Sequence, residues 1–246
     1  MSGTYDDIAP LRRHEPEATG SDQEPTPATT RPETGGHVPI TVIEPEGYAR
    51  GGIVLLHESR EFTGTLLELM RALAGEGWLV IAPNLFHRAP ASSAGVFGDE
   101  LFEDFDACFD WLTHRGVFPD CIGALGFDTA GTAAFLVATN RPIGAAVSVA
   151  APGITAPLTD QAEALVTAAP RLQAPWLGLF GAEPTTPADE VEQLRDASAR
   201  AAVASLVVSY PRLLHRADQP GNDDEDADEL IDSQTRIFDW FDSHLR

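Results

Sequence analysis

The feature that most constrains the fold is the stretch at residues 125–131, Leu-Gly-Phe-Asp-Thr-Ala-Gly, which joins a strand-like run to a helix-like run. A sharp strand-to-helix turn brings backbone segments too close for large side chains two residues before and two after its centre. Gly126 and Ala130 are small residues at those two positions, so the spacing matches a nucleophile elbow. The centre of such a turn is usually serine, and here it is Asp128. Taken alone, the stretch also fits a glycine-rich turn in any α/β protein.

Hydrophobic periodicity divides the chain after residue 36 into alternating strands and helices. Short apolar runs predict strands, whereas apolar residues spaced three and four apart predict helices. This alternation predicts an α/β fold with a mainly parallel, doubly wound sheet flanked by helices. The predicted strands are 37–43, 52–56, 78–82, 122–126, 144–149, 176–180 and 203–210, and the predicted helices are 66–74, 99–113, 132–139, 159–168, 188–201 and 229–245.

The clearest helical pattern lies at residues 99–113, where apolar and acidic residues separate onto two faces. Cys108 lies on the apolar face, so we expect a buried structural thiol rather than a reactive one. The predicted polar face carries Glu103, Asp104, Asp106 and Asp110.

Residues 1–36 are rich in proline and acidic residues and have few aliphatic ones in any regular period. Such a segment cannot bury enough apolar surface to offset the entropy lost on ordering. We therefore expect a disordered N-terminal arm at residues 1–36, followed by one folded domain at residues 37–246.

Charge and composition exclude several functional classes. The chain has 38 acidic and 16 basic residues, a net charge of -22, which repels nucleic acid and anionic membranes. No apolar run approaches a membrane span, and the acidic, polar start of the chain does not resemble a signal peptide. Two cysteines are too few for a disulfide framework and lack metal-ligand spacing. We expect a cytoplasmic monomer or homodimer that acts on a small molecule without a metal or cofactor.

Chemically active residues follow three predicted strands besides the one before Asp128. These are His57-Glu58-Ser59, Glu183 in Gly-Ala-Glu-Pro, and His215. A turn residue, then an acid, then a histidine is the chain order of α/β-hydrolase triads.

The same segments resemble the dienelactone hydrolase family from about residue 37 to the C-terminus. The resemblance implies an α/β-hydrolase fold. Only about 25 residues separate Val149 from Pro175, which leaves no room for the cap domain that dehalogenases insert there. The resemblance is carried by Gly52-Ile-Val-Leu-Leu-His57-Glu58, by Leu79-Val-Ile-Ala-Pro-Asn-Leu-Phe86-His87-Arg88, by Pro119-Asp-Cys-Ile-Gly-Ala-Leu-Gly-Phe127, by Leu179-Phe-Gly-Ala-Glu183 and by Tyr210-Pro-x-x-x-His215.

The resemblance implies a nucleophile–histidine–acid triad, and it maps the nucleophile to Asp128 and the histidine to His215. It also implies a glutamate beside the nucleophile, Glu58, and an arginine for the substrate carboxylate, Arg88. The implied oxyanion donors are the backbone N–H groups of Ser59 and Thr129.

This chain departs from the family pattern at several of these positions. The nucleophilic cysteine is replaced by Asp128, and a second substrate-binding arginine of some members is replaced by Gln219. The triad acid is missing from its usual place, which leaves Glu183 as a weak substitute because Pro184 fixes the loop after it.

An aspartate at the nucleophile position changes the chemistry that the pocket favours. A carboxylate displaces well at saturated carbon, as in haloalkane and epoxide hydrolases, but attack on an ester gives an anhydride and expels a more basic alkoxide. If Glu58 lies beside Asp128, the two carboxylates should share a proton near neutral pH.

Two functional hypotheses stay open at this stage. The first is a hydrolase of small non-peptide substrates, cleaving an ester, a lactone or a carbon–halogen type bond, with Asp128 and His215 as the working pair. The second is a catalytically inactive family member that serves as a binding or partner module.

Overall fold

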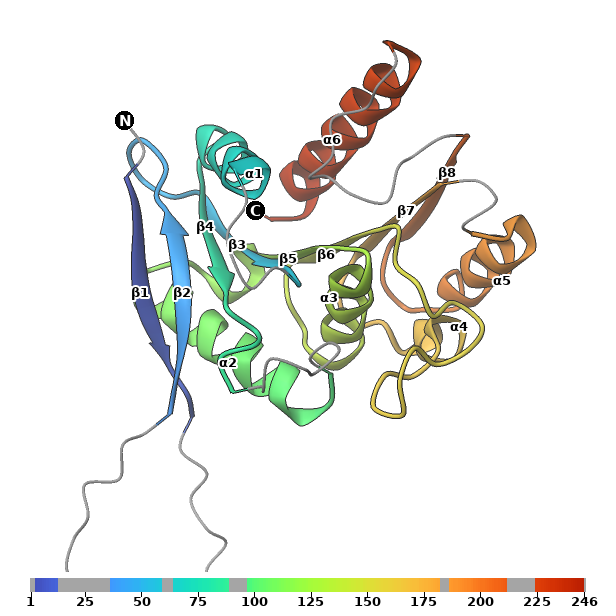
Figure 1. Cartoon of the computed structure of the whole chain (residues 1–246), viewed down its shortest axis with the longest axis horizontal. Helices are drawn as coiled ribbons and strands as arrows, with labels where there is room; N and C mark the ends of the chain where they lie inside the picture. The colour runs from blue at the N-terminus through green and yellow to red at the C-terminus, as the bar shows by residue number, and fades with distance from the viewer. Residues whose placement is uncertain are drawn as a thin grey trace, which may run out of the picture.

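A single eight-stranded sheet forms the centre of the computed structural model, which describes residues 3–12, 36–58, 64–88, 97–181, 186–211 and 224–245 (Figure 1). Its strand order is β1-β2-β4-β3-β5-β6-β7-β8. The strands are β1 (Thr4–Pro10), β2 (His37–Ile43), β3 (Gly51–Leu56), β4 (Trp78–Pro83), β5 (Ile122–Phe127), β6 (Ala145–Val149), β7 (Trp176–Gly181) and β8 (Ser205–Tyr210).

Strands β3 to β8 are parallel, and β1 and β2 form an antiparallel edge beside β4. Parallel neighbours need crossover connections, and helices provide them here. The carboxyl ends of the parallel strands therefore meet at one edge of the sheet. The helices are α1 (Gly64–Gly75), α2 (Asp99–His114), α3 (Thr129–Asn140), α4 (Leu165–Ala168), α5 (Ala188–Ser198) and α6 (Asp224–His244), with short 3₁₀ turns at Pro119–Cys121 and Ala169–Arg171.

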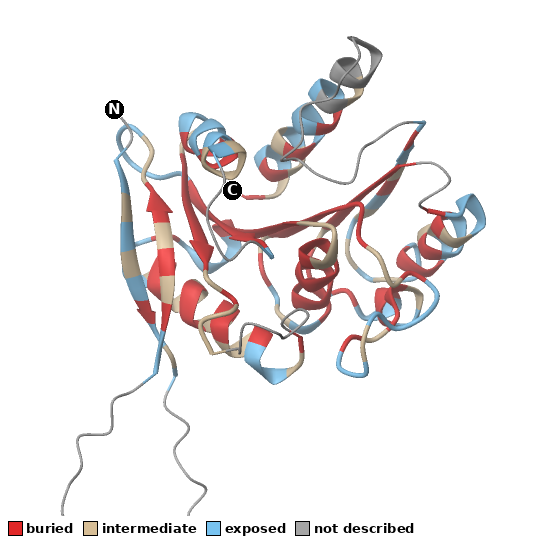
Figure 2. Cartoon of the chain, in the orientation of Figure 1, coloured by how far each residue is buried: buried red, intermediate tan, exposed pale blue. Residues whose placement is uncertain are grey.

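Helices cover both faces of the sheet. Helices α1 and α6 lie on one face and α2 to α5 on the other (Figure 1). Every residue of β3, β4, β6 and β7 is buried, as expected for parallel strands with helices on both sides (Figure 2). None of the described helices has the length and apolar character that crossing a membrane requires.

Most predicted elements are confirmed within a few residues of their bounds, but the helix predicted at residues 159–168 is wrong over its first half. Only α4, Leu165–Ala168, is helical, and Thr159 forms an isolated bridge with Ala162. The backbone N–H groups of Leu165 and Val166 donate to the carbonyls of Gly153 and Ile154. Because the loop at 153–154 accepts these bonds, the preceding residues form no helical turn.

The prediction of a disordered arm is also wrong for its first residues. Strand β1 pairs along its whole length with β2. Long-range contacts hold it: Tyr5 donates to Glu44, Trp111 donates to Asp7, and Arg12 donates two hydrogen bonds to Asp110. Residues 13–35 of the predicted arm lie outside the described residues.

Candidate active site

Asp128 occupies a strained backbone position between β5 and α3. Its φ and ψ angles are 51° and -128°, in a region that residues with a side chain rarely adopt. The Asp128 N–H donates to the carbonyl of Val149 at 2.9 Å, and the Asp128 carbonyl accepts from Gly131 and Thr132 at 2.8 and 3.2 Å. These bonds tie the turn to β6 on one side and to α3 on the other, so the surrounding structure fixes the unfavourable conformation.

The need for a small residue two positions before Asp128 is confirmed. A Cβ atom on Gly126 would lie 2.0 Å from the carbonyl oxygen of Ala130 and 2.4 Å from its carbonyl carbon. No side chain fits at such distances, and the obstacle is backbone that cannot rotate away. The chain therefore passes from strand to helix as tightly as the sequence spacing predicts.

The Asp128 side chain does not cap helix α3, although it stands at the N-cap position. Aspartate at an N-cap usually accepts a hydrogen bond from a backbone N–H of the first helical turn. Here the unusual backbone angles turn the carboxylate aside, and it is partly exposed. Thr129 is the first helical residue, and its N–H belongs to the group that has no acceptor within a helix.

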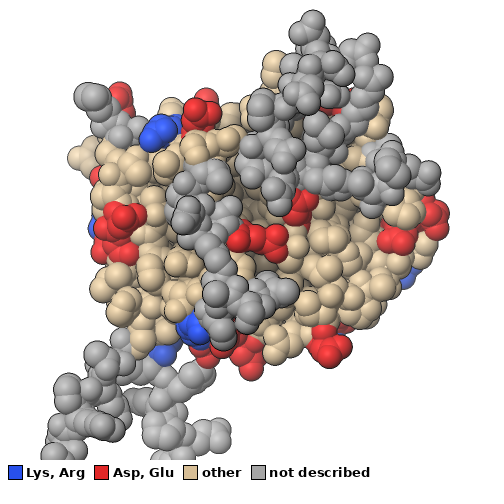
Figure 3. Space-filling model, viewed as in Figure 1, with Lys and Arg blue, Asp and Glu red and all other residues tan. Residues whose placement is uncertain are grey.

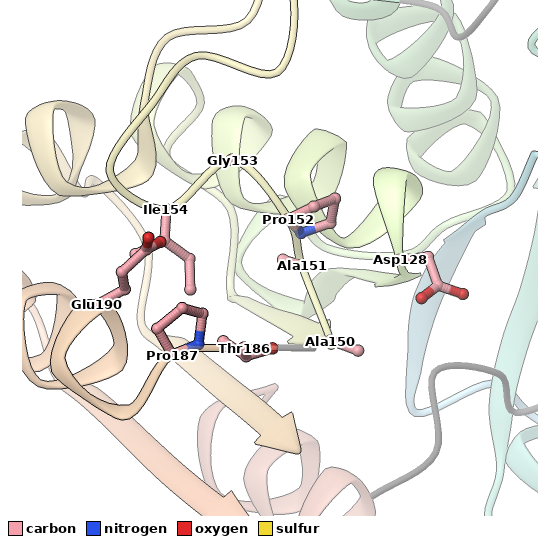
Figure 4. Close-up of a pocket in the computed structure, with 9 residues that line it drawn as sticks. All are labelled: Asp128, Ala150, Ala151, Pro152, Gly153, Ile154, Thr186, Pro187 and Glu190. Carbon is pink, nitrogen blue, oxygen red and sulfur yellow. The ribbon is translucent and has the colours of Figure 1, made fainter. Parts of the chain in front are cut away.

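The Asp128 carboxylate lines a cavity of about 280 Å³ at the carboxyl edge of the sheet (Figure 4). Neighbouring Ala150 also has a positive φ, of 52°. Most of the lining residues have small or apolar side chains, but more of the exposed wall is polar than apolar, and Asp128 and Glu190 lie at opposite ends of the group in Figure 4. The lining residues are Asp128, Ala150, Ala151, Pro152, Gly153, Ile154, Thr186, Pro187 and Glu190.

Arg88 is held by two acidic side chains of α2. Its guanidinium donates to Glu103 at 2.7 Å and also to Asp104. Asp104 is only 1% exposed, so its predicted place on the polar face of the helix is wrong. His87 lies 3.1 Å from both Asp104 carboxylate oxygens. Burial raises the pKa of Asp104, while His87 and Arg88 oppose that rise.

One turn further along α2, Cys108 is fully buried, which confirms the structural thiol. Burial raises the pKa of this thiol, and the nearby Asp104 carboxylate adds to the effect.

The remaining predicted site residues are only partly placed by the structure. Glu58 is the second residue after β3, is exposed, and is not one of the cavity-lining residues. Ser59, Glu183 and His215 lie outside the described residues. The reach from Asp128 to His215 and the orienting role of Glu183 therefore stay predictions.

Sequence reasoning missed the far wall of the cavity. Thr186 and Pro187 come just before α5 and Glu190 lies in its first turn, while the loop at 150–154 follows the end of β6. The available signal was position, because both segments follow carboxyl ends of parallel strands, where ligands gather in such folds. In the part of the chain that the structure describes, no group of three His, Cys, Asp or Glu residues is placed to hold a metal ion.

Solved structures with the same fold include hydrolases of the expected kind. A putative dienelactone hydrolase from Klebsiella pneumoniae superposes with a TM-score of 0.75 at 22% identity, covering 97% of this chain and 98% of that one. The dienelactone hydrolase from Anabaena variabilis has a TM-score of 0.67 at 18% identity, covering 100% of this chain and 99% of that one. A dienelactone hydrolase-like promiscuous phosphotriesterase from metagenomic libraries gives 0.65 at 18% identity, covering 98% of each chain. At these identities the likeness shows the α/β-hydrolase fold.

Sequence comparison is more specific about the family. A Yersinia pestis protein named "Putative carboxymethylenebutenolidase" is 26% identical over 234 residues, covering 88% of this chain and 87% of that protein. A Salmonella typhimurium protein of the same name is 27% identical, covering 95% and 92%. The model of the dienelactone hydrolase family matches residues 39–245, from within β2 to the last residue but one. The chain therefore belongs to the dienelactone hydrolase family.

Proposed function

We propose that this protein hydrolyses small non-peptide substrates, with the Asp128 carboxylate as the reacting group and His215 as its partner. The observation that carries the proposal is the backbone of Asp128, a residue with a side chain held at φ 51° where it lines a cavity. Such conformations cost about 1–3 kcal/mol and cluster at functional sites, where the surrounding structure enforces them. A residue kept only for helix capping would not need this strain, and Asp128 makes no capping bond.

At a saturated carbon, Asp128 is suited to act as a nucleophile. A carboxylate oxygen bonds to the carbon, and the leaving group departs with the electron pair of the broken bond. The product of this step is an ester between the substrate carbon and Asp128. Water then attacks the carbonyl carbon of that ester while His215 accepts a proton from the water. The substrate leaves as an alcohol, and the carboxylate is restored.

At an ester or lactone, Asp128 is better suited to act as a base. Direct attack would form an anhydride and expel an alkoxide more basic than the attacking carboxylate. We propose that Asp128 instead accepts a proton from a water that adds to the substrate carbonyl. The intermediate then breaks its bond to the ester oxygen, and the departing alkoxide takes the proton from Asp128, which leaves an acid and an alcohol. The oxyanion donor that we propose is the N–H of Thr129, the first residue of α3, because the N-terminus of a helix favours negative charge.

Isotope transfer in a single turnover tests both modes. Excess enzyme is mixed in H₂¹⁸O with an ester, a lactone or a haloacid. Mass spectrometry then measures the masses of the product and of the peptide that contains Asp128 after digestion. Nucleophilic displacement puts ¹⁸O into Asp128 and leaves ¹⁶O in the product alcohol. Base catalysis puts ¹⁸O directly into the product acid. Loss of both signals in Asp128→Ala and His215→Ala is the expected control result.

The Asp128→Cys variant tests the pocket independently of the aspartate. A thiolate attacks acyl carbon well, so this variant should turn over activated esters faster than the wild-type protein does. If the wild-type protein turned these esters over as fast as the variant or faster, Asp128 would be a competent centre adapted to its own reaction. No turnover by either protein on the whole substrate panel would instead indicate a member of the family that binds without hydrolysing.

A further inference from the structure

The charges around the cavity limit what kind of substrate it accepts. The described lining residues include two carboxylates, Asp128 and Glu190, and no basic side chain. Glu190 forms no ion pair with any described residue. The other described lining residues carry no charged side chain, and Thr186 is buried. An anionic group placed beside Glu190 would be repelled by its carboxylate.

Arg88 gives independent support, because its positive charge is already balanced. The carboxylates of Glu103 and Asp104 both accept hydrogen bonds from its guanidinium. Asp104 is fixed by burial in α2, and the Arg88 side chain is itself only 24% exposed. Releasing Arg88 to bind a substrate carboxylate would break both of these contacts and take a cation away from a buried acid, which opposes its use as a substrate ligand.

The net charge of the whole protein adds to the negative potential at the cavity. A net charge of -22 repels anions at long range, and acidic side chains are more widespread than basic ones on the face shown in Figure 3. Figure 4 shows Glu190 at the end of the cavity wall opposite Asp128. A substrate whose reacting group faces Asp128 therefore places its distal group near Glu190.

We propose that the cavity selects uncharged and cationic substrates over carboxylates, and that Glu190 determines this specificity by attracting a positive group at the distal end. This inference rests on the proposed function for the identity of the reacting end. It concerns binding, however, and is tested separately from turnover.

The test measures binding of three probes of equal length, butylammonium, butyramide and butyrate, by ligand-observed NMR. The wild-type protein should bind butylammonium most tightly and butyrate most weakly. Glu190→Gln should weaken butylammonium binding by about fivefold, the upper range for a partly exposed ion pair, and leave butyramide unchanged. Asp189→Asn removes the same charge from the exposed neighbouring residue of α5 and should change butylammonium binding less than twofold, by the same reasoning about screened charges.

Two results would overturn the inference. The first is butyrate binding as tight as butyramide binding in the wild-type protein. The second is an equal loss of butylammonium affinity in Asp189→Asn and Glu190→Gln, which would assign the preference to net charge rather than to the cavity. The predicted probe order together with no turnover of matched aryl esters would support the inference and contradict the proposed function.

Discussion

The N–H of Asp128 donates a hydrogen bond of 2.9 Å to the carbonyl of Val149, across the carboxyl ends of the paired strands β5 and β6. The residues that follow this pair of strand ends, Asp128 and Ala150, have φ angles of 51° and 52°. Among the described residues they are the only ones other than glycine with positive φ. Both line the cavity, so the strain of the backbone is concentrated where the substrate is proposed to bind.

Removing the strain at Asp128 should stabilise the fold. We expect Asp128→Gly to be more stable than Asp128→Ala by about 1 kcal/mol or more, because glycine adopts positive φ without the steric cost that alanine keeps. Urea unfolding of the two variants measures the difference. At Thr129, an ordinary helical position, the order should reverse, with the alanine variant more stable by about 1 kcal/mol. Equal stability of the two Asp128 variants would contradict the argument.

A methyl group at Gly126 should disrupt the turn. The Cβ of Gly126→Ala would overlap the backbone of Ala130, so we expect a loss of about 3 kcal/mol or more in the free energy of unfolding, with loss of any activity. Gly75→Ala is the matched control, since its Cβ meets nothing within 4 Å at the end of α1. That variant should stay within about 1 kcal/mol of wild type, on the stabilising side.

The sequence was sufficient to predict the sheet and the turn because both depend on local patterns. Fully buried parallel strands read as continuous apolar runs, and the turn at Asp128 demands small residues at fixed spacing. Strand β1 has no such pattern, since it is an edge strand whose residues alternate between exposed and partly buried. Its side chains bond to Glu44, Trp111 and Arg115, which lie far along the chain.

The candidate site was predictable only in part for the same reason. Asp128 was found from its own turn, whereas Glu190 joins the cavity because α5 begins beside the loop that follows β6. The ion pairs of Arg88 depend on the packing of α2 against β4, and helical periodicity placed Asp104 on the wrong face. A buried acid on a helix is recognised only when its partners, here His87 and Arg88, are known.

The buried Asp104 carboxyl should make stability depend on pH in a defined direction. Burial raises its pKa above the ordinary value of 3.8, so the folded state holds the proton more tightly than the unfolded state does. Its contribution to stability is therefore fully present below the ordinary value and is lost as pH rises through the raised value. Asparagine cannot titrate, so the stability of wild type relative to Asp104→Asn should fall as pH rises from about 4 toward 7.

Urea unfolding of both proteins across that pH range provides the measurement. Glu103→Gln is the control, because Glu103 is 38% exposed and its side chain contacts the same arginine. The free energy of unfolding of Glu103→Gln should differ from that of the wild-type protein by less than about 1 kcal/mol, as for other exposed ion pairs. If the free energy of unfolding of the wild-type protein rose relative to that of Asp104→Asn as pH increased, ion pairing would outweigh burial at this carboxyl.

The alternation of β1 provides the last prediction, which tests whether the N-terminal residues pack against the domain. Ala9 is 0% exposed and Ile8 is 51% exposed, so neighbouring residues point to opposite faces of the strand. Ala9→Asn would bury an amide among apolar side chains, and we expect it to lower the free energy of unfolding by about 2 kcal/mol. Ile8→Asn places the same amide in water and should cost less than about 1 kcal/mol. Urea unfolding of both variants measures the free energies. Equal and small effects would mean that β1 detaches in solution and that residues 4–12 contribute nothing to the stability of the sheet.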